Sequence, residues 1–235
     1  MPRRGRDGGA RRCGGRLVPG VLGRPAGGHL RRGDGAVSEK PLVVVLHGPS
    51  GVGKDSVIAE LKKRLGIHRA TSSTNRAPRG DERHGVDYYF ISDAEFRQKI
   101  ANGEFAEWAE VYGDLKGLER SEIEGPLAEG RDVIIRTDVQ GARTWRKKLE
   151  GAVFIFLMAE DREALRAQLV GRGSEDAESL ARRIAALEDE LDDIENNDYV
   201  VINRHGRLEE AVNEIAEIIR REKANPNRPP ARLIG

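Results

Sequence analysis

The sequence predicts an α/β fold in three layers, with a parallel sheet between two layers of helices. The first observation is a set of short, continuously apolar runs, such as 42–46 and 152–157, which are typical of strands buried on both faces. The second is that amphipathic helical segments separate these runs. The third is a glycine-rich turn directly after the first run, in a strand–turn–helix order.

That turn has the composition of a phosphate-binding loop. It reads Gly48-Pro-Ser-Gly-Val-Gly-Lys-Asp55 and joins a strand expected at 42–47 to a helix expected at 54–65. Glycines let successive N–H groups point at one phosphate, the helix adds its positive N-terminal end, and Lys54 supplies a mobile cation. The alternative is a tight turn that is glycine-rich for other reasons, but strand, loop, Lys and helix together favour a nucleoside triphosphate. We expect ATP contacts from Gly48, Pro49, Ser50, Gly51, Val52, Gly53, Lys54, Asp55 and Ser56.

From residue 41 to residue 223 the pattern alternates between strands and helices. Further strands are expected near 67–71, 88–91, 105–112, 132–137, 152–157 and 199–202. Further helices are expected from a cap at Ser92 or Asp93 to 102–103, and at about 119–129, 142–149, 161–170, 176–195 and 207–223. The insertion at 72–118 has shorter, more polar strands and predicts a small subdomain. Residues 224–235, with three prolines, are expected to form a tail.

Composition limits the classes of protein to which this chain can belong. Its 235 residues suffice for one domain with tails, and 38% hydrophobic residues with a mean hydropathy of −0.58 fit a soluble protein with a modest core. No apolar stretch approaches the roughly 20 residues that span a bilayer. The single cysteine, Cys13, cannot form a disulfide framework, so a reducing compartment is expected. We therefore expect a cytoplasmic protein with no membrane partner.

The first 40 residues differ from the rest in charge. They hold nine Arg and one Lys against three acidic residues (net +7), which leaves 30 basic and 36 acidic residues (net −6) for the remainder. Eleven glycines and little apolar periodicity predict that residues 1–40 are disordered. A nucleic-acid-binding arm and a targeting peptide are alternatives, although transit peptides are normally Ser-rich and amphipathic. We favour a dispensable extension, with Val37 as a candidate translation start, and expect no nucleic-acid binding by the folded domain.

A polar stretch at 72–90 is the second candidate for chemistry. It reads SSTNRAPRGDERHGVDYYF, in which Pro78 stiffens the loop between Arg76 and Arg79. Arginine suits bidentate recognition of phosphate. Further polar contacts are available from Glu82, Tyr88 and two serines. The residues alone leave two interpretations open, an acceptor-phosphate site and a solvated polar loop.

These stretches and three later motifs resemble guanylate kinase in order and spacing. The five motifs are GPSGVGK, SSTNRAPRGDERHGVDYYF, GEFAEWAEVYG at 103–113, DVQGA at 138–142 and GRG at 171–173. The resemblance covers about residues 41–220, and the second motif is far more specific than the phosphate loop. It implies a P-loop kinase with a core, an acceptor-binding subdomain at about 72–118 and a helical lid at about 171–185. The implied substrates are ATP, with Mg²⁺, and GMP or dGMP.

The resemblance also implies roles for individual residues. By position, Arg76, Arg79 and Tyr88 match the residues of the family that bind the GMP phosphate. Glu82 matches an acidic residue that holds these arginines in place. The positions that contact guanine match Ser72, Glu107 and Asp138, and a carboxylate suits the N1 and N2 donors of guanine. The implied catalytic residues are Lys54 and the lid arginines Arg172 and Arg183. A surface arginine on a charged helix is the alternative for Arg183. By position, Asn203 matches the residue of the family that contacts the ATP base.

The chain departs from the family's pattern around the transferring phosphate. Asp55 stands where a Ser or Thr hydroxyl usually coordinates Mg²⁺, and Arg136 replaces the first aspartate of an Asp-Ile-Asp run. A cation at 136 could pair with Asp55 and rearrange the support of the metal, and we expect Asp55 to be a metal ligand. Lys116-Gly117-Leu118 replaces Tyr-Gly-Thr/Ser. Lys116 can serve as a phosphate ligand, whereas Leu118 cannot hydrogen-bond a base.

Three functions follow from these patterns. The leading one is ATP-dependent phosphoryl transfer to GMP or dGMP, giving GDP or dGDP. The second is a kinase for another phosphorylated acceptor, because ribose 1,5-bisphosphate phosphokinase also ends its phosphate loop in Lys-Asp, although it lacks the Arg76, Arg79 and Glu107 set in this form. The third is a non-catalytic guanylate-kinase-like binding module, but such modules usually lose the phosphate loop. We expect a monomer or a homodimer.

Overall fold

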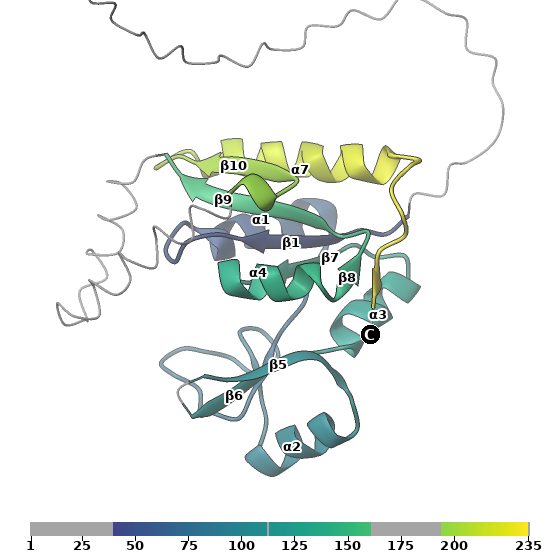
Figure 1. The fold of residues 1–235 in the computed structure, drawn as a ribbon. Coiled ribbons are helices and arrows are strands. Elements are labelled where there is room, and N and C mark those ends of the chain that lie inside the picture. Colours follow the sequence, from purple (N-terminus) through teal and green to yellow (C-terminus); the bar gives the residue numbers. More distant parts are fainter. Residues whose placement is uncertain (1–39, 112, 161–193, 235) are drawn as a thin grey trace, which may run out of the picture. The chain divides into compact units, whose positions relative to one another are not determined.

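The computed structural model describes residues 40–111, 113–160 and 194–234 (Figure 1). The chain divides into two units, 1–37 and 38–235, and all described residues belong to the second. The strands are β1 Val43–His47, β2 His68–Arg69, β3 Ser73–Thr74, β4 Tyr89–Phe90, β5 Phe105–Val111, β6 Asp114–Glu119, β7 Val133–Arg136, β8 Leu149–Glu150, β9 Val153–Ala159, β10 Tyr199–Asn203 and β11 Arg232–Leu233. The helices are α1 Lys54–Leu65, α2 Asp93–Ala101, α3 Ser121–Ala128, α4 Val139–Arg146 and α7 Leu208–Ala224, with a 3₁₀ turn at Ile194–Asn196.

A five-stranded parallel sheet forms the centre of the described unit. Its strand order is β10-β9-β1-β7-β2, and every neighbouring pair is parallel. Val44 of β1 pairs with Ile134 on one side and Val153 on the other, so that β1 lies in the middle of the sheet. Parallel strands buried on both faces need continuous apolar runs, which is why these segments were recognisable in the sequence. The predicted α/β fold with a parallel sheet is confirmed.

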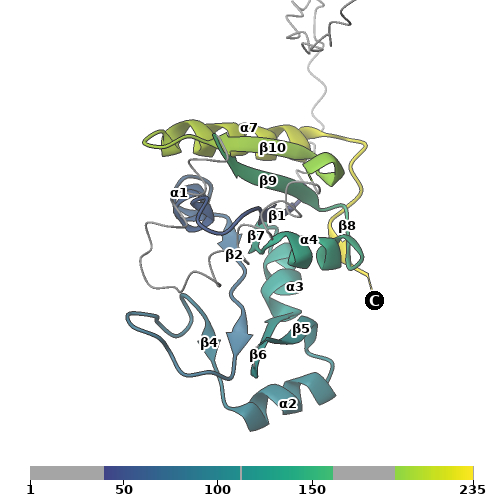
Figure 2. The ribbon, with the colours of Figure 1, turned by 60° about the vertical axis from the view of Figure 1, so that its left-hand side comes forward.

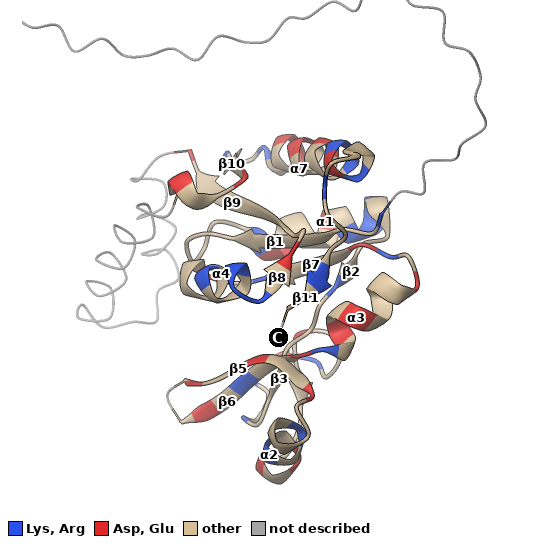
Figure 3. Cartoon of the chain, turned by 45° about the vertical axis from the view of Figure 1, so that its right-hand side comes forward, with Lys and Arg blue, Asp and Glu red and all other residues tan. Residues whose placement is uncertain are grey.

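Helices cover both faces of this sheet (Figure 2). Alternate residues of β1 point to opposite faces, so Val44 packs with α1 and α7, while Val45 packs with α3 and α4. Figure 3 shows β1 and β9 without charged residues, whereas α7 carries acidic and basic residues along its length. The apolar side of α7 is buried through Ala211, Val212, Ile215, Ala216, Ile218 and Ile219. Three layers are therefore held by two separate apolar cores.

A second, smaller sheet follows β2. Its order is β4-β3-β6-β5, with β3 and β4 parallel and the other pairs antiparallel. Helix α2 packs on it through Phe96, whose ring stacks on Phe105 at 4.4 Å between centroids. The Ser92 hydroxyl caps α2 by accepting a hydrogen bond from the Glu95 N–H, as expected. β6 was not expected, because its sequence DLKGLE lacks the β-branched and aromatic residues typical of strands.

The start of one helix differs from the prediction for a local reason. α4 begins three residues earlier than expected, because the Asp138 carboxylate accepts a hydrogen bond from the Gly141 N–H and caps the helix. The helices expected at 161–170 and 176–195 lie mainly outside the described residues, as do the expected disordered arm and lid. None of the described helices is long and apolar enough to cross a membrane.

The C-terminal segment corrects the expectation of a tail. Arg232 and Leu233 form β11, which pairs antiparallel with β8. Arg228 is only 6% exposed, and its guanidinium donates hydrogen bonds to the carbonyl oxygens of Lys40, Gly151 and Glu222. The prolines follow α7 but do not prevent packing, since a buried arginine satisfies one nearby carbonyl and two that are distant in the sequence.

We expect Arg228→Ala to lower the free energy of unfolding by roughly 2–3 kcal/mol, because buried carbonyl oxygens lose their donors. Arg232→Ala is the matched control, since Arg232 is exposed and pairs with Glu150 at the surface. That change should cost about 1 kcal/mol or less. Urea unfolding of both variants tests this, and equal losses would contradict the role given to Arg228.

Candidate active site

The loop between β1 and α1 requires glycine at two positions for different reasons. Gly48 has a φ of +135°, and a Cβ there would lie 2.2 Å from the backbone oxygen of Leu157. Gly53 has a φ of +91°, and a Cβ there would lie 2.6 Å from the Nδ2 atom of Asn203. That Nδ2 donates to the carbonyl oxygen of Val52 at 2.8 Å. The loop therefore lies close to Leu157 of β9 and Asn203 of β10, and a side chain at Gly48 or Gly53 would collide with them.

Lys54 is the first residue of α1 and is almost fully buried. Its Nζ donates to the carbonyl oxygens of Gly48 and Pro49, at 2.6 and 2.8 Å. The loop thus curls around the ammonium group, next to the positive end of the helix. Both features favour an anion at this point.

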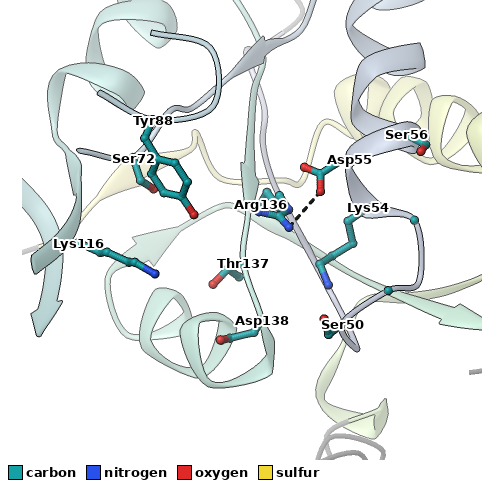
Figure 4. Close-up of a pocket in the computed structure, with 12 residues that line it drawn as sticks. Ser50, Lys54, Asp55, Ser56, Ser72, Tyr88, Lys116, Arg136, Thr137 and Asp138 are labelled. Carbon is teal, nitrogen blue, oxygen red and sulfur yellow. Dashed lines mark ion pairs between the residues drawn. The ribbon is translucent and has the colours of Figure 1, made fainter. Parts of the chain in front are cut away.

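A cavity of about 530 Å³ opens beside this loop (Figure 4). It is lined by Ser50, Gly51, Gly53, Lys54, Asp55, Ser56, Ser72, Tyr88, Lys116, Arg136, Thr137 and Asp138. Residues expected to bind the donor nucleotide and residues expected to bind the acceptor therefore share one cavity. Thr137 was not predicted, although its place directly after a buried strand, at the carboxyl edge of a parallel sheet, is where ligands bind.

Arg76 is held rigidly at the edge of the small sheet. Its two terminal nitrogens donate to the two carboxylate oxygens of Glu82, each at 2.7 Å. Its guanidinium also lies over the rings of Tyr88 and Phe90, 5.0 and 5.7 Å from their centroids. The hydrogen bonds from Arg76, and one from the Arg79 backbone, lower the pKa of Glu82 to about 2. Glu82 therefore holds the guanidinium of Arg76.

Arg79 is placed differently from Arg76. Its guanidinium is 74% exposed and lies 3.7 Å from the Asp114 carboxylate. Only its backbone N–H reaches Glu82, at 2.9 Å. The side chain is consequently available to a ligand but is not preorganised by the protein.

Two carboxylates lie near each other on different elements. Burial raises the pKa of Glu107, on β5, while the charge of Lys148 opposes that rise and the charge of Asp138 adds to it. Asp138 follows β7, and one of its oxygens accepts the Gly141 N–H at 2.7 Å. Its other oxygen has no hydrogen-bond partner within the described part of the chain.

Leu118, which was expected not to bind a base, is only 2% exposed and packs in the core.

Asp55 pairs with two arginines, as the sequence suggested for one of them. Its Oδ2 atom lies 3.0 Å from Arg136, and its Oδ1 atom lies 3.4 Å from Arg69. Arg69 was not foreseen, because nothing in its sequence context marks it. It lines a second cavity of about 650 Å³ with Lys62 and Arg83, and Asp55 lines both cavities. Within residues 40–111, 113–160 and 194–234, no three His, Cys, Asp or Glu side chains gather as a metal-holding group.

The remaining predicted residues have mixed outcomes. Arg172 and Arg183 lie outside the described residues. Asn203, the last residue of β10, contacts the phosphate loop through Val52, and its Oδ1 atom is buried with no hydrogen-bond partner among the residues that the structure describes. Its expected contact with the ATP base stays a prediction.

Comparison with known proteins identifies the family. Residues 39–222 match the guanylate kinase family over most of the chain. The chain belongs to the guanylate kinase family. It is 44% identical over 187 residues to guanylate kinase 2, chloroplastic/mitochondrial, of Oryza sativa subsp. japonica, covering 79% of this chain and 66% of the rice protein. It is 43% identical over 196 residues to the guanylate kinase of Symbiobacterium thermophilum, covering 83% of this chain and 92% of that protein.

A solved structure agrees with this assignment. The crystal structure of guanylate kinase from Anaplasma phagocytophilum matches with a TM-score of 0.64 and 30% identity, covering 81% of this chain and 90% of that one. The family is one of ATP:GMP phosphotransferases. The chain is thus an enzyme of the P-loop kinase class, and its phosphate loop and small sheet are the parts of a guanylate kinase domain.

We expect Glu82→Gln to raise the KM for GMP by about tenfold, because Arg76 loses a charged bidentate partner and its fixed orientation. The KM for ATP should stay near the wild-type value. Glu124→Gln is the control, since Glu124 pairs with Arg120 at the surface of α3. Steady-state kinetics with both substrates test this, and an unchanged KM for GMP would show that Glu82 does not position Arg76 for the acceptor.

Proposed function

We propose that this chain transfers the γ-phosphoryl group of ATP to GMP or dGMP, giving GDP or dGDP. The observation that carries the proposal is the shared cavity, which is lined by Lys54 of the phosphate loop and, at the small sheet, by Lys116 of β6 and by Ser72 and Tyr88, which directly precede β3 and β4. Phosphoryl transfer needs little covalent chemistry from the protein, so catalysis consists of positioning and charge neutralisation. The acceptor phosphate is itself an anionic nucleophile, and no general base is required.

The donor side binds the triphosphate through the loop. Backbone N–H groups of residues 50–53 and the start of α1 supply dipoles, and Lys54 supplies charge to the β- and γ-phosphates. Asp55 is the carboxylate that would hold Mg²⁺, which fits because it is 57% exposed and because Mg²⁺ takes most of its ligands from phosphates and water. When bound, the ion neutralises charge on the transferring group. Arg172 and Arg183 are proposed to add to this from the lid.

On the acceptor side, different residues are proposed to bind the phosphate and the base of GMP. Tyr88, Lys116 and the arginine held by Glu82 are proposed to bind the phosphate of GMP, together with Arg79. Ser72, Glu107 and Asp138 are proposed to bind guanine. A carboxylate accepts hydrogen bonds from N1 and N2 of guanine at once, whereas adenine has no such donor pair. This arrangement supports a preference for GMP over AMP.

A second acceptor is favoured by two observations. Leu118 is buried in the core and offers no hydroxyl to a base, while Lys116 lines the cavity as an additional cation. Both suit a bisphosphorylated sugar such as ribose 1,5-bisphosphate.

A coupled assay with Mg-ATP and GMP, dGMP, AMP or ribose 1,5-bisphosphate distinguishes the acceptors. GMP and dGMP should be phosphorylated fastest. If ribose 1,5-bisphosphate is phosphorylated and GMP is not, the second function replaces the proposed one.

Lys54→Ala should lower kcat by about 10²–10³-fold without unfolding the protein, because the ammonium group serves the phosphates and not the core. Lys62→Ala, on an exposed turn of the same helix, should leave kcat unchanged. Circular dichroism confirms folding, and coupled-assay kinetics measure the loss. Near wild-type turnover by the Lys54 variant would contradict the assignment of the phosphate loop.

Glu107→Gln and Asp138→Asn should each raise the KM for GMP by about 5- to 150-fold, since an amide presents a mispaired donor to guanine. The KM for ATP should not change.

The pH dependence gives an independent check on Glu107. Its pKa is raised, so on acidification it protonates at a higher pH than an ordinary glutamate and loses its ability to accept both guanine donors. The wild-type KM for GMP should therefore rise as the pH falls through this raised pKa. The Glu107→Gln variant should lack that rise, and the same acidic limb in both proteins would argue against the guanine contact.

A further inference from the structure

We propose that Arg136 is a catalytic arginine that binds the donor and acceptor phosphates at once, and that Asp55 holds its guanidinium in the cleft between them. This rests on the proposed kinase function. The two departures at residues 55 and 136 are then one coupled change, in which a carboxylate moves to the phosphate loop and a cation takes its place at the end of β7.

The backbone of Arg136 is fixed by the sheet. β7 pairs with β1 on one side and β2 on the other, and Arg136 itself lies opposite Leu46 of β1. The three residues before it are at most 3% exposed. Arg136 is the last residue of this buried strand, so its side chain leaves the sheet at the carboxyl edge, where the phosphate loop also begins.

The side chain lies between the two halves of the cavity. Figure 4 shows the Arg136 guanidinium with Lys54 and Asp55 on one side and Tyr88 and Lys116 on the other. It is therefore placed where a γ-phosphate on the loop and a phosphate on the small sheet would approach each other. Two anions in contact repel strongly, and a planar guanidinium can donate to both because its N–H groups form a fixed fork.

The guanidinium can exchange its partner without disturbing the core. Asp55 is its one partner among the residues that the structure describes, and the Arg136 side chain is 39% exposed. Phosphate oxygens can therefore replace the carboxylate. During transfer an oxygen of the acceptor phosphate forms the new P–O bond while the bridging oxygen leaves on ADP. Arg136 supplies charge and hydrogen bonds.

A simpler role for Arg136 is to neutralise Asp55, and a double variant separates the two roles. If Arg136 binds phosphates, Arg136→Ala should lower kcat on the order of 100-fold both in the wild type and in the Asp55→Ser background. Asp55→Ser alone should stay within about tenfold of the wild type, since it restores the usual hydroxyl. Arg136→Ala/Asp55→Ser with wild-type kcat would overturn the proposal, because the arginine would then serve only the carboxylate.

Binding supplies a readout that does not depend on turnover. The probe is an inhibitor in which a pentaphosphate chain links adenosine to guanosine, measured by calorimetry with the full-length protein. Arg136→Ala should weaken this inhibitor more than it weakens ATP or GMP alone, and Arg136→Lys should recover part of the loss. Equal losses for all three ligands would overturn a bridging role.

Arg69→Ala is the matched control. Arg69 pairs with the same carboxylate but lines the second cavity and not the one beside Lys54, so its removal should change kcat and inhibitor binding by at most about fivefold. A loss as large as that of Arg136→Ala would overturn the proposal in favour of a general effect on Asp55. If the wild-type enzyme phosphorylates another acceptor but not GMP, the proposed substrate is wrong and the role of Arg136 is not affected. The Arg136→Ala variant is then compared with the wild type on that acceptor.

Discussion

The parallel pairing of β1 with β7 is the constraint on which the rest of the structure depends. Both strands are buried on both faces, and both end at the same edge of the sheet. The phosphate loop leaves one strand and residues 136–138 leave the other, so the anion-binding loop, a cation and a carboxylate emerge side by side. Because the strands are fixed by the core, these groups need little reorganisation when phosphates arrive.

Three cations in or beside the cleft are held by acceptor groups of the protein. Arg76 is held by Glu82, Arg136 by Asp55, and Lys54 by loop carbonyls. Each of these three cations is thus oriented before substrate binds. The difference lies in burial, since Arg76 is 8% exposed while Arg136 is 39% exposed. Arg76 is consequently the fixed part of the site and Arg136 the part able to move.

The parallel sheet, the phosphate loop and α1 could be predicted from the sequence because each depends on local pattern. Apolar runs mark buried strands, and Gly48 and Gly53 stand where a side chain would collide with the backbone of Leu157 or with Asn203. Features that depend on distant contacts could not be predicted. β6 lacks a strand-like composition, and the packing of Arg228 depends on carbonyls up to 188 residues away in the chain. The second arginine on Asp55 was missed for the same reason.

A crystal structure of the protein with the pentaphosphate-linked adenosine–guanosine inhibitor tests the central claim most directly. The claim is that one cleft, bounded by the phosphate loop and the small sheet, holds the phosphates of both substrates. The account predicts that the phosphate chain runs from Lys54 toward Tyr88, with the Arg136 guanidinium moved from Asp55 onto the chain. A phosphate chain outside this cleft, or an Arg136 still paired with Asp55, would contradict it.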